Sequence, residues 1–180
     1  MNKPETHPVA TLHNLGTEPL SVEPFVSPEF YAAEVETIFR SCWLNVGFAG
    51  DIPNPGDYLV KDVETLNVSI LFVRGQDGEI RAFHNACPHR GNKVALGRGN
   101  SKGFACGFHG WTFDLQGKLA FVPDEEQFFN LDKATRGLVP IHCDTWQNFI
   151  FFTLEETPEK SLKEYLGGMG EQVAGFPHDT

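Results

Sequence analysis

The sequence of 180 residues contains no apolar run that approaches the roughly 20 residues needed to span a bilayer. It has no charged-then-apolar leader segment, no internal repeat and no low-complexity stretch. Cysteine is scarce, with four residues in total. These absences predict no membrane partner and a cytoplasmic location, in which cysteines stay reduced.

Basic residues are also few: the chain has 14 Lys and Arg against 24 Asp and Glu, which gives a net charge of −10. This balance speaks against nucleic acid as a partner. The stretch between Pro88 and Ala105 is different, because it has no acidic residue and four basic ones: Arg90, Lys93, Arg98 and Lys102. We interpret it either as a solvated loop, with Arg90 bound to backbone carbonyls, or as a rim that attracts an acidic partner.

Two short segments combine cysteine with histidine. Cys87–Gly91 reads C-x-H-x-G and is called the first hook, and Cys106–Trp111 reads C-x-x-H-G-W and is called the second hook. Two thiolates and two imidazoles suit zinc, or an iron–sulfur centre in which imidazoles replace two cysteines. Zinc sites of mixed ligation usually pair cysteines on one hairpin and histidines on another. One Cys and one His in each hook favour a cluster, with Cys87 and Cys106 on one iron and His89 and His109 on the other.

The motif CPHRG followed by C-x-x-HGW-x-FD-x-x-G resembles the Rieske [2Fe–2S] motif of ring-hydroxylating, non-haem iron oxygenase large (alpha) subunits, over roughly residues 40–155. The resemblance implies a cluster bound by Cys87, His89, Cys106 and His109. Respiratory Rieske proteins carry an extra cysteine in each hook, which this chain lacks. The oxygenase or ferredoxin branch is therefore expected, near the lower end of a potential range of about −150 to +300 mV. One departure is Phe108, where the family usually has Tyr.

Four further residues are expected to surround the cluster. Arg90 follows the first histidine, and Gly91 and Gly110 would let backbone N–H groups approach the sulfur atoms. Trp111 would shield the cluster or line the path of the electron. The alternative for Trp111 is an ordinary core tryptophan.

The fold class expected is mainly β, an antiparallel Rieske-type sandwich with the hooks in hairpin-like loops at one end. The composition, with 41% hydrophobic residues and 16 Phe, allows one domain with a sound core. We predict an extended arm over 1–26, an amphipathic helix over 27–42, a Rieske domain over 43–155, and a short helix and tail over 156–180. The Gly167-Gly168 pair is expected to end that last helix.

Within the β region, we expect a hairpin with a turn at Gln76–Glu79, a second hairpin over Trp111–Val122, and closing strands at Leu138–His142 and Asn148–Leu154, joined through Asp144–Gln147. Lys93–Gly103 is expected to be a loop, and Asp124–Gly137 a loop or short helix. His84 and His142 are interpreted as strand residues, with His84 exposed, and Cys42 and Cys143 as buried small apolar residues.

The resemblance implies one-electron transfer from a ferredoxin or reductase to the mononuclear Fe(II) of an oxygenase. That iron belongs to a C-terminal catalytic domain, commonly in a neighbouring subunit of a trimer, and the chain stops where this domain would begin. No catalytic residue is expected in the chain, since its other histidines lack the family's H-x4-H spacing. The alternatives are a stand-alone Rieske ferredoxin-like carrier and a zinc-clasped binding module.

Overall fold

The computed structural model describes residue 19 and residues 21–174, which fall into two units divided between Ala32 and Ala33. In the first unit α1 spans Glu23–Val26, and α2, Pro28–Glu34, begins after Ser27 and ends two residues past the division. The Ser27 hydroxyl accepts a hydrogen bond from the Phe30 N–H at 3.1 Å, which confirms the predicted helix start. The prediction of an extended arm is wrong for Glu23–Val26, and residues 1–18 and 20 of that arm lie outside the described residues.

The second unit opens on the continuation of this helix. A π-helical segment, η2, spans Val35–Phe39, and the Arg40 N–H reaches the Val35 carbonyl at 3.0 Å. Val35 and Phe39 pack on the core, whereas Ile38 is 47% exposed. The helix predicted over 27–42 therefore ends at Phe39, three residues early, and its last turn is a π turn.

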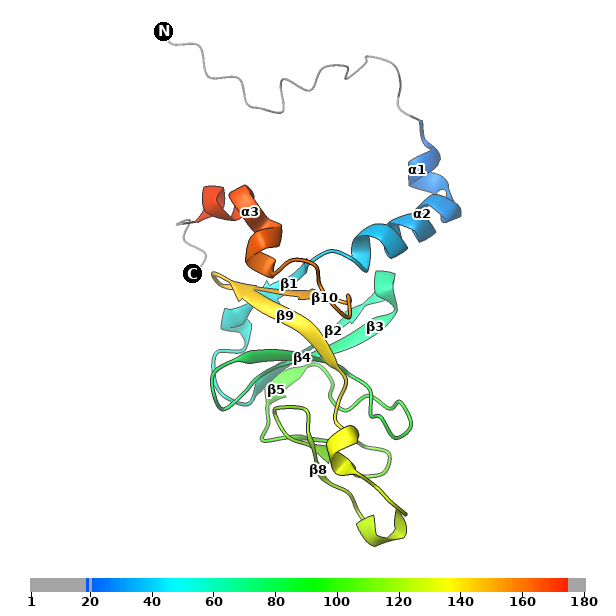
Figure 1. The fold of residues 1–180 in the computed structure, drawn as a ribbon, viewed down its shortest axis with the longest axis vertical. Coiled ribbons are helices and arrows are strands. Elements are labelled where there is room, and N and C mark those ends of the chain that lie inside the picture. The colour runs from blue at the N-terminus through cyan, green and yellow to red at the C-terminus, as the bar shows by residue number, and fades with distance from the viewer. Residues whose placement is uncertain (1–18, 20, 175–180) are drawn as a thin grey trace. The chain divides into compact units, whose positions relative to one another are not determined.

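A seven-stranded antiparallel sheet forms most of this unit, in the order β1-β10-β9-β4-β3-β2-β5 (Figure 1). Its strands are β1 Leu44–Phe48, β2 Asp57–Val63, β3 Val68–Arg74, β4 Ile80–His84, β5 Arg98–Asn100, β9 Pro140–Trp146 and β10 Phe149–Thr153. Short 3-10 turns, η3 Ala49–Asp51 and η4 Glu64–Leu66, flank β2. The predicted hairpin between β3 and β4 is present, with Gly78 at φ +83° in its turn.

A smaller antiparallel sheet contains β6 Phe104–Ala105, β7 Thr112–Phe113 and β8 Leu119–Phe121. β7 and β8 form the second predicted hairpin. The mainly β, antiparallel fold class is thereby confirmed. Asp124–Gly137 is a loop with two 3-10 turns, η5 Glu125–Gln127 and η6 Lys133–Thr135, as expected.

The core has two parts that meet at β3. Ile70 and Phe72 belong to one hydrophobic cluster, and Leu71 and Val73 belong to the other. Successive side chains of a strand point to opposite faces, so β3 is buried on both sides. The first of these clusters, with Ile70, also contains residues of β9 and β10, and the second contains both candidate cysteine ligands.

Three further expectations for this unit are wrong. The loop 93–103 contains β5, which pairs with β2 through partners such as Leu59 and Arg98. β9 continues to Trp146, so that the turn to β10 is shorter than predicted and has Gln147 at φ +53°. The last helix, α3, spans Leu162–Val173 and is kinked at Gly167 rather than ended there.

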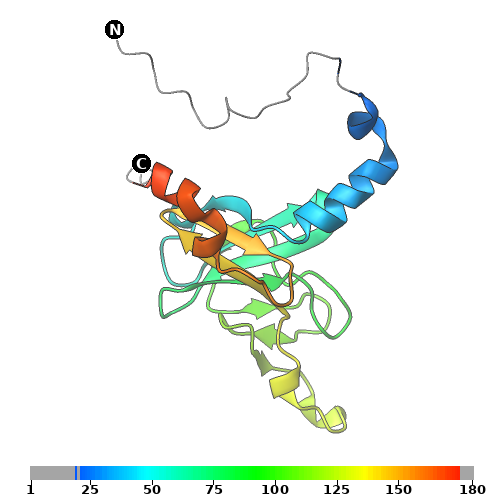
Figure 2. The same ribbon diagram turned by 45° about the horizontal axis from the view of Figure 1, so that its top comes forward.

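The two hooks lie where β structure gives way to loops. The first hook follows β4, and the second connects β6 to β7. Within residues 33–174, Figures 1 and 2 show α3 beside β9 at one end, and β8 with the Asp124–Gly137 loop at the other. Among the described residues, no helix has the length and apolar character required to cross a membrane.

Candidate metal centre

The backbones of the two hooks follow the same hydrogen-bond pattern. The Gly91 N–H donates to the Cys87 carbonyl at 2.8 Å, and the Gly110 N–H donates to the Cys106 carbonyl at 2.9 Å. The Cys87 N–H donates to the Asn92 carbonyl, and the Cys106 N–H to the Trp111 carbonyl, both at 2.8 Å. The hooks are thus equivalent turns whose cysteines occupy the same position.

This equivalence places the two histidines at neighbouring, not identical, positions. Counted from the cysteine, His89 matches Phe108, and His109 matches Arg90. The rings of His89 and His109 nevertheless come together, with centroids 4.6 Å apart and planes inclined by 58°. The one-residue offset between C-x-H and C-x-x-H therefore brings the two imidazoles to one point from opposite loops.

The two thiols also form a pair. Cys87 and Cys106 are 2% and 4% exposed, both are free thiols, and each lies within hydrogen-bonding reach of the other. Burial raises the pKa of the Cys87 thiol above its ordinary value. Burial also opposes ionisation of Cys106, but hydrogen bonds from the backbone N–H groups of Phe108 and His109, together with those from the Cys87 and Asn92 side chains, lower the pKa of that thiol.

Backbone N–H groups face the sulfur atom in both hooks. Those of His89 and Arg90 face Cys87, as those of Phe108 and His109 face Cys106. The Asn92 side-chain amide adds a contact across the hooks, 3.8 Å from the Cys106 sulfur. Such donors stabilise negative charge on sulfur, which a thiolate ligand carries.

The imidazole pair faces outward, in contrast to the thiols. His109 is exposed and His89 is half-buried. Burial, followed by the neighbouring His109 and Arg90, lowers the pKa of His89, and this favours the neutral ring that binds metals. Side chains of the four residues therefore form a buried sulfur pair and an outer nitrogen pair.

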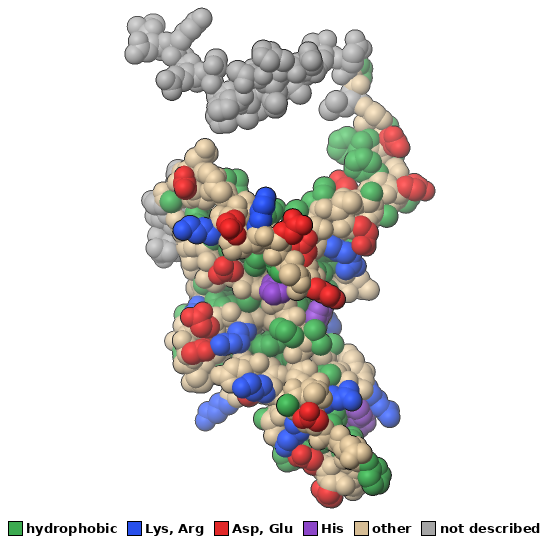
Figure 3. All heavy atoms as spheres, viewed as in Figure 1, with side chains coloured by type: hydrophobic (Ala, Val, Ile, Leu, Met, Phe, Trp, Pro, Cys, Tyr) green, Lys and Arg blue, Asp and Glu red, His purple; other side chains and the backbone are tan. Residues whose placement is uncertain are grey.

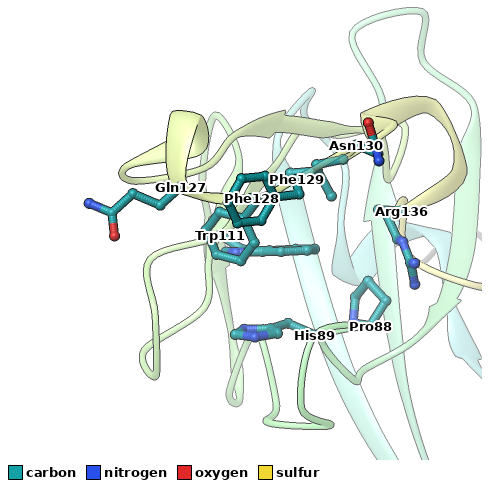
Figure 4. Close-up of a pocket in the computed structure, with 9 residues that line it drawn as sticks. Pro88, His89, Trp111, Gln127, Phe128, Phe129, Asn130 and Arg136 are labelled. Carbon is teal, nitrogen blue, oxygen red and sulfur yellow. The ribbon is translucent and has the colours of Figure 1, made fainter.

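An aromatic layer covers His89. The Trp111 indole lies parallel to the His89 ring, at 4.9 Å and 10°, and Phe128 meets the indole edge-on at 5.8 Å (Figure 4). A cavity of about 440 Å³ opens beside this stack, with Phe129 and Arg136 among the residues that line it. Trp111 itself is 4% exposed, and its Nε1–H has no hydrogen-bond partner in the part of the chain that is described.

Comparison with known proteins shows the family to which the chain belongs. The Rieske [2Fe-2S] domain family matches residues 42–142, which include both hooks and β9 as far as His142. The chain belongs to this family. The motif's resemblance to Rieske oxygenase large subunits is confirmed, because the proteins similar to this chain are oxygenase components.

One relative is the carnitine monooxygenase oxygenase subunit of Acinetobacter baumannii, 31% identical over 83% of this chain and 40% of its own length. The large oxygenase component of the naphthalene 1,2-dioxygenase system of Pseudomonas aeruginosa is 38% identical over 79% of this chain and 32% of its own length. Among solved structures, the apo form of a quaternary ammonium Rieske monooxygenase has a TM-score of 0.79 and 29% identity, over 86% of this chain and 45% of that one. The chain thus spans less than half the length of each of these proteins.

The cofactor of a Rieske domain is a [2Fe–2S] cluster, and the residues present fit it. A Rieske cluster takes two sulfur ligands on one iron and two nitrogen ligands on the other. The buried thiol pair and the outer imidazole pair provide these two kinds of donor.

Sequence reasoning missed one residue that shapes this Rieske site. Asn85, two residues before the first hook, is 2% exposed and makes four hydrogen bonds. Its oxygen accepts the N–H groups of Val94 and Ala95, and its amide donates to Ser69 and to the Ala95 carbonyl. Asn85 therefore ties the end of β4 to the chain beyond the hook. The sequence signal was a lone Asn after the apolar strand, and it is weak.

The other candidate residues have ordinary surroundings. His84 is half-buried rather than exposed, and burial lowers its pKa. His142 lies in β9, and its Nε2 is 3.1 Å from the Glu156 carbonyl. Cys42 and Cys143 are half-buried, less than predicted, and burial raises the pKa of Cys143 to about 11.

The basic stretch between the hooks is partly neutralised. The Lys93 ammonium pairs with Asp62 of β2 at 2.8 Å, which the sequence did not suggest. Arg90, Arg98 and Lys102 are exposed, and no ion pair of theirs occurs within the described part of the chain. On the face shown in Figure 3, Lys and Arg side chains lie beside a histidine near the lower end of the body.

Proposed function

We propose that Cys87 and Cys106 ligate one iron, and His89 and His109 the other, of a Rieske [2Fe–2S] cluster. When bound, such a cluster takes up and releases a single electron. The observation that carries this proposal is the separation of a buried thiol pair from an outer imidazole pair. The thiols anchor the cofactor among backbone N–H donors, and the imidazoles reach the surface where an electron partner can approach.

We further propose that the chain is the electron-transfer part of a Rieske oxygenase subunit. It would pass electrons from a ferredoxin or reductase to the mononuclear iron of a catalytic domain, and act as an oxidoreductase only together with that domain. The oxygenase relatives, two to three times as long, support this assignment. In the same proposal, residues 43–155 are the Rieske domain, 27–42 its flanking helix, and 156–180 the segment that leads to the catalytic domain.

Relatives also support a neighbouring subunit as a partner. A solved quaternary ammonium Rieske monooxygenase is described as using inter-subunit electron transfer. We propose the same route here, within the trimer common in the family. The relatives' names include carnitine and naphthalene, so ring hydroxylation of an aromatic compound is only one of the activities that fit. All four cysteines are free thiols, which agrees with the proposed cytoplasmic location.

An acidic electron donor is the partner that suits the surface beside the hooks. Arg90, Arg98 and Lys102 would attract it to the imidazole end, chiefly by raising the association rate.

The alternatives of a stand-alone carrier and a zinc-clasped module are less well supported. The matched relatives are oxygenase subunits, and the matched family binds an iron–sulfur cluster.

The test is the rate at which a reduced, acidic plant-type ferredoxin reduces the cluster-loaded chain. We expect this rate to fall steeply with salt, and to drop several-fold at low salt in Arg90→Gln and Lys102→Gln. Lys163→Gln, which removes the same charge from α3, is the matched control and should reduce as fast as the unchanged chain. A rate that is independent of salt would contradict the proposed docking surface, and a chain that binds no cluster would contradict the whole function.

A further inference from the structure

The two candidate histidine ligands have unequal surroundings. His89 has the Trp111 indole stacked on it, at 4.9 Å and 10°, with Phe128 edge-on to both rings at 5.8 and 6.2 Å. Among the described residues, the ring contacts of His109 are with His89 and with its sequence neighbour Phe108, a residue that is 57% exposed. One imidazole is held by buried aromatic rings, and the other lies against a ring that faces solvent.

A stack of this kind restricts rotation of the imidazole. The imidazole and the indole are nearly parallel at 4.9 Å, and rotation of the imidazole about its Cβ–Cγ bond would break this stack. The indole is itself fixed, since Trp111 is 4% exposed within the cluster that contains Cys87 and Cys106. The plane of His89 is therefore set by the core, whereas the plane of His109 is set only by local contacts.

We propose that Trp111 is a positioning residue that fixes the orientation of the His89 imidazole on the cluster, and that Phe128, which contacts both rings edge-on, supports this arrangement. This inference rests on the proposed function, because it takes His89 as a ligand. Its consequence is that the two nitrogen ligands are inequivalent, with a single, sharply defined orientation for His89 and a broader one for His109.

Pulsed EPR of the dithionite-reduced, cluster-loaded chain measures this directly, since it resolves the hyperfine coupling of each ligating imidazole nitrogen. In the unchanged chain we expect two couplings, one narrower than the other. Trp111→Leu should shift or broaden the narrow coupling by more than its line width and leave the other in place. Trp111→Phe, which keeps a ring on His89, should restore most of the narrow signal.

Phe108→Leu is the complementary variant, because it removes the ring beside His109 and should alter only the broad coupling. Phe128→Ala leaves the core residue in place, and it should perturb the narrow coupling less than Trp111→Leu does. It also keeps the test valid if Trp111→Leu loads no cluster. Two outcomes would overturn the inference. In the first, the narrow coupling stays unchanged in every Trp111 and Phe128 variant that loads a cluster. In the second, the substitutions alter both couplings alike. Absence of any imidazole coupling in the unchanged chain would instead refute the ligand assignment itself.

Discussion

Gly91 and Gly110 adopt the same left-handed backbone conformation, at φ +74° and +73°, at equivalent positions of the two hooks. Each closes a turn by donating its N–H to the carbonyl of the cysteine four residues earlier. A residue with a Cβ is strained in this region by roughly 1–2 kcal/mol. Gly91 is needed for its backbone conformation alone, since a Cβ at this position would meet nothing within 4 Å.

The two glycines differ in what a side chain would touch, and this gives a matched pair of variants. Gly91→Ala should lower the free energy of unfolding by about 1 kcal/mol from backbone strain alone. Gly110→Ala should lower it further, because its Cβ would lie 2.9 Å from Pro123. Urea unfolding measures both. Equal losses would show that Pro123 gives way, and no loss in either would contradict the left-handed turns.

Asn85 provides a second prediction. Asn85→Leu removes all four hydrogen bonds and leaves the N–H groups of Val94 and Ala95 buried without an acceptor. We expect a loss of about 3 kcal/mol or more in the free energy of unfolding, together with reduced cluster content. Gln116→Leu, at an exposed position, is the control and should change neither. Asn85→Leu with unchanged stability would mean that the loop after the first hook is held by other contacts.

The pH dependence of stability follows from the β3–β4 turn. Both oxygens of Asp77 accept hydrogen bonds from Arg81, at 2.8 and 2.6 Å, and this lowers the pKa of Asp77 from 3.8 to about 2. A carboxyl group with a lowered pKa in the folded state stabilises that state above its unfolded pKa. The contribution declines as pH falls through the folded value. It should therefore be complete above about pH 5, be largely lost by about pH 2 and vanish below that.

A comparison of Asp77→Asn with the unchanged chain tests this window. The urea midpoint of the variant should be lower by a small, constant amount from pH 7 to about 5, since the pair is exposed, and the gap should close between about pH 4 and 2. In an Arg81→Gln background the same substitution should have much less effect at any pH. A gap that persists undiminished at pH 2 would exclude ionisation of Asp77 as its cause.

The kink in α3 supplies a fourth prediction. Gly167 has φ +46° and ψ −137°, a region that residues with a side chain rarely adopt, whereas Gly168 lies in regular helix with open space around its Cβ position. Gly167→Ala should therefore destabilise the chain by about 1–3 kcal/mol. Gly168→Ala should stabilise it by up to about 1 kcal/mol. If both substitutions stabilise, the kink is a preference of the sequence and not a requirement of the fold.

The hooks could be predicted from the sequence because their chemistry is local. Cysteine, histidine and glycine stand within six residues of one another, and the ligand types restrict the cofactor. The antiparallel class and both hairpins follow from strand patterns and turn residues in the same way. Gly167 shows the limit of local rules, since the sequence placed a helix end where packing of α3 against β9 lets the helix resume.

What could not be predicted depends on residues far apart in the chain. Phe128 covers Trp111 only because the Asp124–Gly137 loop folds back over the second hook. β5 has no strand pattern of its own, and Arg98-Gly99-Asn100 becomes a strand only by lying beside β2. The sequence contains no sign of an ion-pair partner for Lys93, because its partner Asp62 is 31 residues away.

The most direct test of the account is the iron and acid-labile sulfide content of the anaerobically purified chain, with an EPR spectrum after dithionite reduction. We predict two irons and two sulfides per chain and a signal of low average g, the mark of a histidine-ligated [2Fe–2S] centre. Cys87→Ser and His109→Ala should abolish both the metal and the signal. Zinc without sulfide, or a full spectrum in either variant, would contradict the ligand assignment on which the proposed electron transfer depends.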